Sequence, residues 1–409
     1  MKKSYTKSII DELRKYEPKA MNEHQLPVVW MSAQNDQVMD AEGKTYIDFT
    51  SGIFVTNVGH GTVAGAVQHQ ASQLLHCYTF PHMSRLALSK KMRELTGFEK
   101  SFFLSSGTEA TDSAVKIMRL HRKQHCIVSL FGAMHGKSQC AEKLRGNDGS
   151  NEWASHDEME NYHLMNPFDG CFYDDMRVLT YKRAPKEIAG FMIESYRGWN
   201  AKFYDKKYIQ DLMSYAKKYK IPVCFDDIQG GFGRTGKLFA YEHYGVKPDL
   251  VCVGKGLGGG LPISAVLGSA NLLDTPDDLS STHSANPLCC EAALASLEYM
   301  QKNDLPKLAE AKGEILQREL LKLVSSSVVK EVNCKGMLAA VIFTNAIHAD
   351  NVIWRAMKKG LLMVRTGRES IKIGPPLTIT LSDMMEGLKI LEDSVNEERK
   401  STKAIKKVF

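Results

Sequence analysis

The stretch Ile221–Gly268 constrains the fold of this chain more than any other part of it. It consists of two short apolar runs, each of which ends abruptly in polar, chemically active side chains. The first run ends in Asp226 and Asp227, and the second ends in Lys255, which stands between two glycines. Short apolar runs bounded by turn residues are typical of buried parallel strands, and ligands of open α/β sheets bind at the carboxyl ends of such strands. The stretch therefore predicts an α/β sheet in which a carboxylate and an amine face one crevice.

Lys255 and Asp226 are the residue types that pyridoxal 5′-phosphate (PLP) requires. Taken singly, a lysine is most often solvated at the surface, and a carboxylate at the end of a strand most often caps a turn. A lysine confined among glycines loses hydration, which lowers its pKa and leaves an amine able to form a Schiff base. PLP also needs an anion beside its pyridine nitrogen, which keeps the ring protonated and electron-withdrawing. Side chains alternate along a strand, so only one of Asp226 and Asp227 can meet the ring. We predict Lys255 and Asp226 as the catalytic residues.

A third segment has the features of a phosphate site. Ser106, Gly107 and Thr108 lie between an expected strand, Ser101–Leu104, and an expected helix. The N-terminus of a helix presents unpaired N–H groups and a partial positive charge, which suit a phosphate dianion. A helix cap without a ligand, in which Ser106 is the N-cap and Glu109 follows three residues later, accounts for the same residues. The segment predicts a phosphate site only in combination with Lys255 and Asp226.

The order of patterns along the chain predicts the fold class. From Ser101 onward strand and helix patterns alternate, which predicts a large α/β domain with a mainly parallel central sheet, assigned to residues 61–304. One of the strands is expected at Met176–Tyr181. The flanking residues 1–60 and 305–409 mix short strands with helices, and they predict a smaller α+β domain built from both ends of the chain.

Composition limits the kinds of partner. The 409 residues carry a net charge of only +6, and no basic stripe interleaved with aromatic residues predicts nucleic-acid binding. The N-terminus has no apolar core of a signal peptide, and no apolar run is long enough to span a membrane. The nine cysteines are scattered without C-x-x-C spacing, which predicts reduced thiols and no metal site. A cytoplasmic protein is expected.

A glycine-rich loop imitates a nucleotide-binding motif. Gly231–Gly236 matches G-x-G-x-x-G, and with Lys237 it matches most of a P-loop. The P-loop match fails at Leu238, where a Ser or Thr should bind magnesium. No helix pattern follows the glycines, and no acidic residue ends a strand about 20 residues later. We do not expect a nucleotide site here.

The same motifs resemble the class III (omega-type) aminotransferases of PLP fold type I. FDDIQGGFGRTGKLFAYEHYGVKPDLVCVGKGLGGGLPISAVLG resembles the signature of that family nearly from end to end. SSGTEATDSAVKIMR resembles its phosphate-loop segment, GKTYIDFTSGI its N-terminal motif and STHSANPLCCEAAL its interface motif. The resemblance extends over roughly Val28 to Thr380.

The resemblance implies a role for each matching residue. Lys255 binds the cofactor and moves protons, Asp226 pairs with the pyridine nitrogen, and Gln229 reaches the 3-oxygen of the ring. The implied dimer places Thr282 of one subunit at the phosphate of the other. The remaining implied cofactor-binding residues are Ser106, Gly107, Thr108, Met134, His135 and Glu194, of which Glu194 supports Asp226 and Met134 replaces an aromatic ring that stacks on PLP.

Departures from the family pattern concern the substrate. Trp199 stands where members that use glutamate and 4-aminobutyrate have an acidic residue, and Lys372 stands where an arginine is usual. Lysine does not reproduce the bidentate grip of arginine on a carboxylate. Arg197, Arg365 and Arg368 are candidate substitutes. We expect an amino donor such as glutamate and an acceptor other than a standard 2-oxo acid, such as an oxo-sugar or an omega-aldehyde.

Two other functions use the same motifs. The first is a PLP-dependent isomerase, meaning an aminomutase such as a semialdehyde aminomutase, a racemase or an epimerase. The second is a PLP-binding protein without catalytic activity. Because Asp226, Gln229 and Lys255 are all present, the sequence favours an enzyme over a non-catalytic protein. The motifs do not exclude an isomerase, and an aminotransferase is the preferred interpretation.

Overall fold

A seven-stranded sheet contains the stretch that the sequence analysis singled out. The computed structural model describes residues 5–22, 26–146, 152–154, 161–182, 184–275 and 279–401. The strands of the sheet follow one another in the order β4 (Lys100–Leu104), β10 (Ser264–Gly268), β9 (Leu250–Val253), β8 (Val223–Asp226), β7 (Ile188–Glu194), β5 (Cys126–Leu130) and β6 (Asn161–Leu164). The neighbours from β9 to β6 are parallel, and β10 runs antiparallel to β9 and β4. The predicted α/β fold with a mainly parallel central sheet is confirmed.

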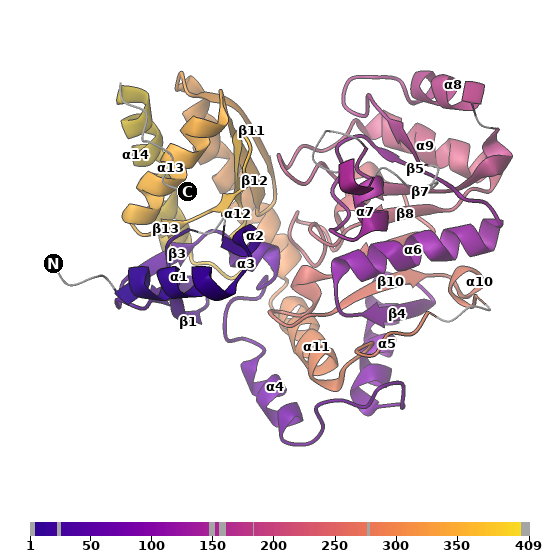
Figure 1. Cartoon of the computed structure of the whole chain (residues 1–409), viewed down its shortest axis with the longest axis horizontal. Helices are drawn as coiled ribbons and strands as arrows, with labels where there is room; N and C mark the ends of the chain where they lie inside the picture. Colours follow the sequence, from indigo (N-terminus) through magenta and orange to yellow (C-terminus); the bar gives the residue numbers. More distant parts are fainter. Residues whose placement is uncertain are drawn as a thin grey trace. The chain divides into compact units, whose positions relative to one another are not determined.

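Both faces of this sheet are covered, as the apolar strand runs require. Every residue of β5, β7, β8, β9 and β10 is buried. Helix α6 (Gly107–Arg122) lies across one face (Figure 1) and packs its apolar side, including Ala114 and Met118, into the core with Ile127 and Val266. Strands that are buried on both faces are apolar throughout, because a helix on each side removes them from water.

The rest of this unit consists mainly of helices. They are α4 (Ala64–Ala71), α5 (Met83–Thr96), α7 (Gln139–Lys143), α8 (Phe172–Lys182), α9 (Lys206–Tyr219), α10 (Ala270–Leu273) and α11 (Pro287–Lys302). The strand expected at Met176–Tyr181 is wrong, because these residues belong to α8. Phe172, Met176 and Leu179 are buried at helical spacing, and a run this short does not distinguish the two periods.

A second compact unit is built from both ends of the chain. It comprises residues 1–62, 199–201 and 308–409, whereas residues 63–198 and 202–307 form the unit with the seven-stranded sheet. One of its sheets has the order β1 (Trp30–Gln34), β2 (Gln37–Asp40), β3 (Thr45–Asp48) and β13 (Leu361–Leu362), and the other has the order β11 (Val329–Lys335), β12 (Leu338–Phe343), β15 (Ser370–Ile373) and β14 (Val364–Arg365). Its longer helices are α1 (Tyr5–Tyr16), α12 (Leu305–Leu321), α13 (Ala346–Lys358) and α14 (Leu381–Lys400).

Whether these two units fold as the domains expected at 1–60, 61–304 and 305–409 stays a prediction. Within the described ranges, no helix combines the length and the apolar character needed to cross a membrane.

Candidate active site

The carboxyl ends of three adjacent strands bring the predicted catalytic residues together. Glu194, the last residue of β7, pairs in register with Asp226, the last residue of β8. Asp226 pairs in turn with Cys252 on β9, and Lys255 follows two residues after that strand ends. The structure thus places two carboxyl groups and one amine at a single edge of the sheet, where the sequence predicted a crevice.

Lys255 has an unusual backbone and an unusual environment. It begins the short 3₁₀ helix Lys255–Leu257 with a φ of +44°, a value that non-glycine residues rarely adopt. Such conformations persist where the surrounding structure imposes them, and they cluster at functional sites. Burial lowers the pKa of the Lys255 amine, although the negative charges of Asp226 and Glu194 oppose this effect. The amine is therefore easier to deprotonate than that of a solvated lysine.

Asp226 is held by a histidine from another segment. The Nδ1 atom of His135 lies 2.8 Å from Oδ2 of Asp226, and His135 is only 2% exposed. The other carboxylate oxygen, Oδ1, accepts a hydrogen bond from the backbone N–H of Ile228 at 3.2 Å. Thr111 fixes the histidine backbone, because its hydroxyl donates to the carbonyl of His135 at 2.8 Å. The carboxylate of Asp226 therefore has a defined orientation.

Asp227 has partners different from those of Asp226, in agreement with the expected alternation. Its Oδ2 atom accepts a hydrogen bond from the backbone N–H of Tyr241 at 3.4 Å, and burial raises the pKa of Asp227 to about 8. Burial also raises the pKa of Glu194 to about 7, against the effect of nearby His135. Both groups retain a proton at higher pH than an exposed acid does. Asp226, held by His135 and by the Ile228 N–H, is the acid whose geometry suits pairing with a cation.

The first turn of α6 contains the capping box that was the alternative to a phosphate site. The Glu109 carboxylate accepts hydrogen bonds from the backbone N–H of Ser106 at 2.7 Å and from its hydroxyl at 2.8 Å. Both donors of Ser106 are thus engaged within the cap. The N–H groups of Gly107 and Thr108 belong to the first turn, where a helix offers no carbonyl partner, so they still suit an anion.

Ile228, to which no sequence motif assigns a contact with the cofactor, lies between the first turn of α6 and the segment of Lys255. A Cβ atom at Gly107 would lie 3.1 Å from Cδ1 of Ile228, and one at Gly254 would lie 3.3 Å from its Cγ2 atom. Both glycines thus permit close approach to one apolar side chain. An amine, a carboxylate, helix N–H groups and an apolar surface form a set of contacts that fits PLP, which carries an aldehyde, a ring nitrogen, a phosphate and a flat ring.

The other predicted cofactor residues have varied surroundings. The amide oxygen of Gln229 accepts a hydrogen bond from the Tyr196 hydroxyl at 3.1 Å. Met134 is 42% exposed, immediately before buried His135. Thr282 is exposed in the turn that precedes α11. Within the described residues, no group of three or more His, Cys, Asp or Glu side chains could hold a metal ion.

Arg197 and the other two predicted substrate residues are described within their own units. Arg197 donates to the carbonyl of Phe131 at 3.0 Å, and its guanidinium lies 4.4 Å from the centre of the Phe168 ring. Trp199 and Lys372 belong to the unit formed by the chain ends, where the carbonyl of Trp199 accepts from Ser370 and the amine of Lys372 lies over a phenylalanine ring. Their roles in substrate binding stay predictions.

Comparison with known proteins identifies the family of the chain. The model of the family described as "Aminotransferase class-III" matches residues 19–395 of the chain. A leucine/methionine racemase of Thermococcus litoralis is 32% identical, over 97% of this chain and 98% of the racemase. An acetylornithine aminotransferase of Methanocaldococcus jannaschii is also 32% identical, over 92% of this chain and 95% of that enzyme.

A solved structure resembles the whole chain. The crystal structure of acetylornithine aminotransferase from Elizabethkingia anophelis is 28% identical in sequence and superposes with a TM-score of 0.82. The match covers 97% of this chain and 100% of that one. Fold and sequence therefore lead to the same family.

Proposed function

This chain belongs to the class III aminotransferases, which depend on PLP, and we propose that it moves an amino group from a donor such as glutamate to an oxo or aldehyde acceptor. The observation that carries the proposal is the convergence of Lys255, Asp226 and the first turn of α6 on one side of the sheet. Each of these groups matches one polar feature of the cofactor.

The residues of this site have separate tasks in the proposal. When bound, PLP supplies an aldehyde that condenses with amines and a protonated ring that withdraws electrons from the neighbouring carbon. The amine of Lys255 holds the cofactor and then takes and returns the substrate proton. Asp226, oriented by His135, holds a proton on the ring nitrogen. The N–H groups of Gly107 and Thr108 bind the phosphate, and Gln229 donates to the ring 3-oxygen.

We propose an acceptor that lacks the usual α-carboxylate contact. Lys372 offers a compact ammonium group where a bidentate guanidinium is usual. Trp199 offers an indole face in place of an acidic side chain, and such a face suits a sugar ring as well as an apolar chain. Arg197 supports this choice, because its guanidinium already contacts the Phe131 carbonyl and the Phe168 ring. An oxo-sugar or an omega-aldehyde is the acceptor class that agrees with these replacements.

Isomerisation is the second candidate. The racemase of Thermococcus litoralis matches this chain at 32% identity over nearly its whole length. A racemase and an aminotransferase both remove and return a proton. In racemisation the product keeps its amino group, whereas in transamination the amino group stays on the enzyme and an oxo product is released. The cofactor-binding residues serve both reactions equally.

Incubation of the purified holoenzyme with an amino donor alone separates the two reactions. For an aminotransferase, we expect the visible absorbance of the lysine-bound cofactor to fall and stay low, while one oxo product is released per active site. Addition of a competent acceptor, drawn from oxo-sugars, omega-aldehydes and 2-oxo acids, should restore the band. A racemase would keep the band and invert the donor instead, and retention of the band with every donor tested would contradict the proposal.

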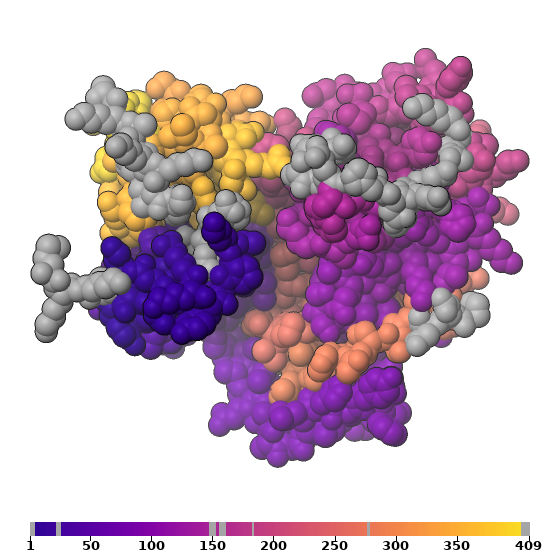
Figure 2. Space-filling view, in the orientation of Figure 1, coloured from indigo at the N-terminus to yellow at the C-terminus, as the bar shows by residue number. Residues whose placement is uncertain are grey.

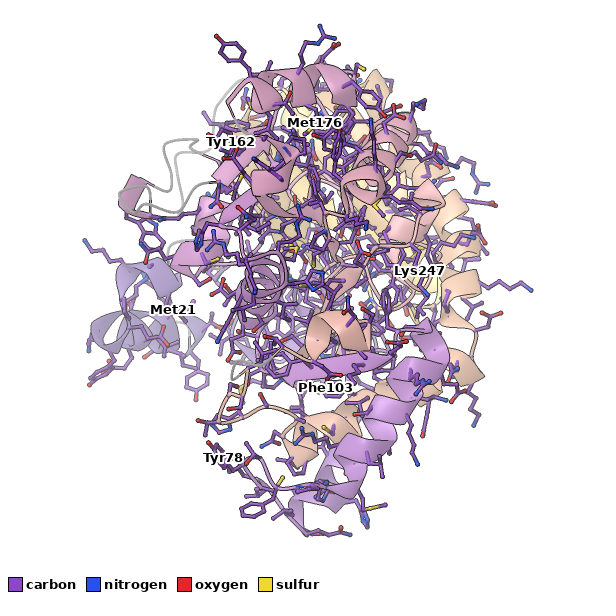
Figure 3. The ribbon with its side chains drawn as sticks, turned by 90° about the vertical axis from the view of Figure 1, so that its right-hand side faces the viewer. Met21, Tyr78, Phe103, Tyr162, Met176 and Lys247 are labelled. Carbon is purple, nitrogen blue, oxygen red and sulfur yellow. The ribbon has the colours of Figure 1, made fainter. Side chains whose placement is uncertain are left out.

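We also propose that the active form is a homodimer in the cytoplasm. The segment from the end of α4 into α5 exposes a run of large apolar side chains, namely Leu74, Leu75, Tyr78, Phe80, Met83 and Leu86. In Figure 3, Tyr78 lies at the lower left, on the outside of the ribbon. In Figure 2 the purple part of the chain that includes α4 and α5 is exposed at the bottom of the view. Clustered exposed apolar residues mark interaction sites. All nine cysteines are free, which supports a reducing compartment.

The dimer is tested by mass in solution. We expect sedimentation equilibrium to give about twice the 45.7 kDa of the chain. The double variant Phe80→Glu and Met83→Glu should be monomeric, and it should bind PLP less tightly because Thr282 of the partner subunit is lost from the phosphate. Tyr181→Glu is the control, since Tyr181 is 93% exposed on α8 outside this segment. A monomeric wild-type chain with full activity would overturn the proposal.

A further inference from the structure

We propose that Tyr196 is a positioning residue that fixes the Gln229 amide with its NH₂ group toward the cofactor. The inference deepens the proposed function and rests on it, because it takes Gln229 as the group that contacts the ring 3-oxygen. Its starting point is one hydrogen bond, in which the Tyr196 hydroxyl donates to Oε1 of Gln229 at 3.1 Å.

The two ends of an amide side chain are chemically different. Oε1 only accepts hydrogen bonds, and Nε2 only donates them, so the orientation of Gln229 decides what it offers to a ligand. A ring oxygen that carries negative charge needs a donor. Because Tyr196 occupies the accepting end, the donating end of Gln229 is left for the ring oxygen. Without that hydroxyl, both orientations of the amide become accessible.

Tyr196 is held firmly enough to make this selection. It is 3% exposed, and its ring stacks on Phe203 with centroids 5.3 Å apart and an interplanar angle of 26°. Its backbone neighbour is also fixed, since the buried hydroxyl of Tyr244 donates to the Ser195 carbonyl at 2.7 Å and accepts from the Tyr204 N–H at 3.0 Å. Ring and backbone are thus both constrained.

The local charges keep the phenol in its donating form. Burial, together with the nearby acids Asp227 and Glu194, raises the pKa of Tyr196 well above its usual value, although Arg234 opposes this. The hydroxyl therefore retains its proton over the whole working range of pH. A phenolate would instead attract the NH₂ end of Gln229 and reverse the amide.

The test compares Tyr196→Phe with Tyr204→Phe. Both tyrosines are buried in the segment that follows β7, but the Tyr204 hydroxyl has no hydrogen-bond partner in the described structure. We expect Tyr196→Phe to raise the pH midpoint of the visible absorbance change of the holoenzyme by about 0.5–1 pH unit, because the deprotonated form loses a donor at the 3-oxygen. The value of kcat/KM should fall several-fold, and Tyr204→Phe should change neither quantity.

Gln229→Leu separates this inference from the proposed function. It should raise the same midpoint, and the double variant Tyr196→Phe and Gln229→Leu should show no further rise, because both changes act through one amide. If Gln229→Leu shifts the midpoint and Tyr196→Phe does not, or if the two shifts add, Tyr196 does not orient Gln229. If Gln229→Leu leaves the midpoint unchanged, the proposed contact between Gln229 and the cofactor is itself absent.

Discussion

Replacing Lys255 by alanine is expected to remove both the covalent attachment of PLP and nearly all catalytic activity. In the proposal this amine both binds the cofactor and transfers the substrate proton. Proton transfer by a positioned group alone contributes about 10²–10⁴-fold, so we expect kcat to fall by at least about 10³-fold. The visible band of the lysine-bound cofactor should be lost, as measured by absorbance after the protein is incubated with PLP and the free cofactor is removed by dialysis.

Two further variants identify the cause of that loss. Lys255→Arg keeps a positive charge but cannot attach the cofactor, so it should resemble Lys255→Ala in both readouts. Lys237→Ala removes an exposed lysine from the same glycine-rich stretch and should leave activity and absorbance unchanged. Burial lowers the pKa of Lys255, so covalent attachment to the cofactor-free protein should become fast at a lower pH than is usual for lysine. Retention of the band in Lys255→Ala would refute the assignment.

The sequence was sufficient to predict the sheet edge, because strand ends and side-chain alternation are local properties. Asp226 and Lys255 each follow a short apolar run, and such runs become neighbouring parallel strands when helices cover both faces. Alternation also separated Asp226 from Asp227, and the structure gives them different partners, His135 and Tyr241. These predictions needed no knowledge of distant contacts.

Contacts between distant segments could not be predicted in the same way. His135 and Asp226 are 91 residues apart in the chain, and Tyr196 and Gln229 are 33 apart. The family resemblance placed His135 and Asp226 at one cofactor, but no periodicity or spacing predicts the direct contact within either pair, because tertiary packing brings these side chains together. The helix α8 was missed for a related reason, since its buried face is determined by what packs against it.

The capping box of α6 shows how one motif can support two functions. Ser106 and Glu109 were expected either to cap the helix or to accompany a phosphate site. The structure contains the cap, while the first-turn N–H groups of Gly107 and Thr108 stay suitable for an anion. The two interpretations are compatible, because a cap and a ligand use different donors of the same helix end.

Asp226→Asn is expected to lower kcat/KM by about 10²–10³-fold, which is the size of effect that loss of one preorganised electrostatic partner produces. The neutral amide cannot hold a proton on the ring nitrogen, so the ring would withdraw electrons less effectively. It would also weaken the contact with His135, which lies 2.8 Å from the carboxylate. The absorbance band should persist, since Lys255 is intact. Activity can be followed in the two half-reactions separately, and both should slow.

Asp227→Asn is the matched control at the adjacent position. Burial raises the pKa of Asp227 from 3.8 to about 8, so the side chain is largely neutral at pH 7, and an amide changes its charge little. We expect activity within a few-fold of wild type. An acid with a raised folded-state pKa contributes stability that is complete below pH 3.8 and is lost as pH rises toward 8. Thermal unfolding measured at several pH values should therefore show a smaller loss of stability between pH 3.8 and 8 for Asp227→Asn than for the wild type. Equal losses of activity in the two variants would mean that Asp226 has no special position at the ring nitrogen.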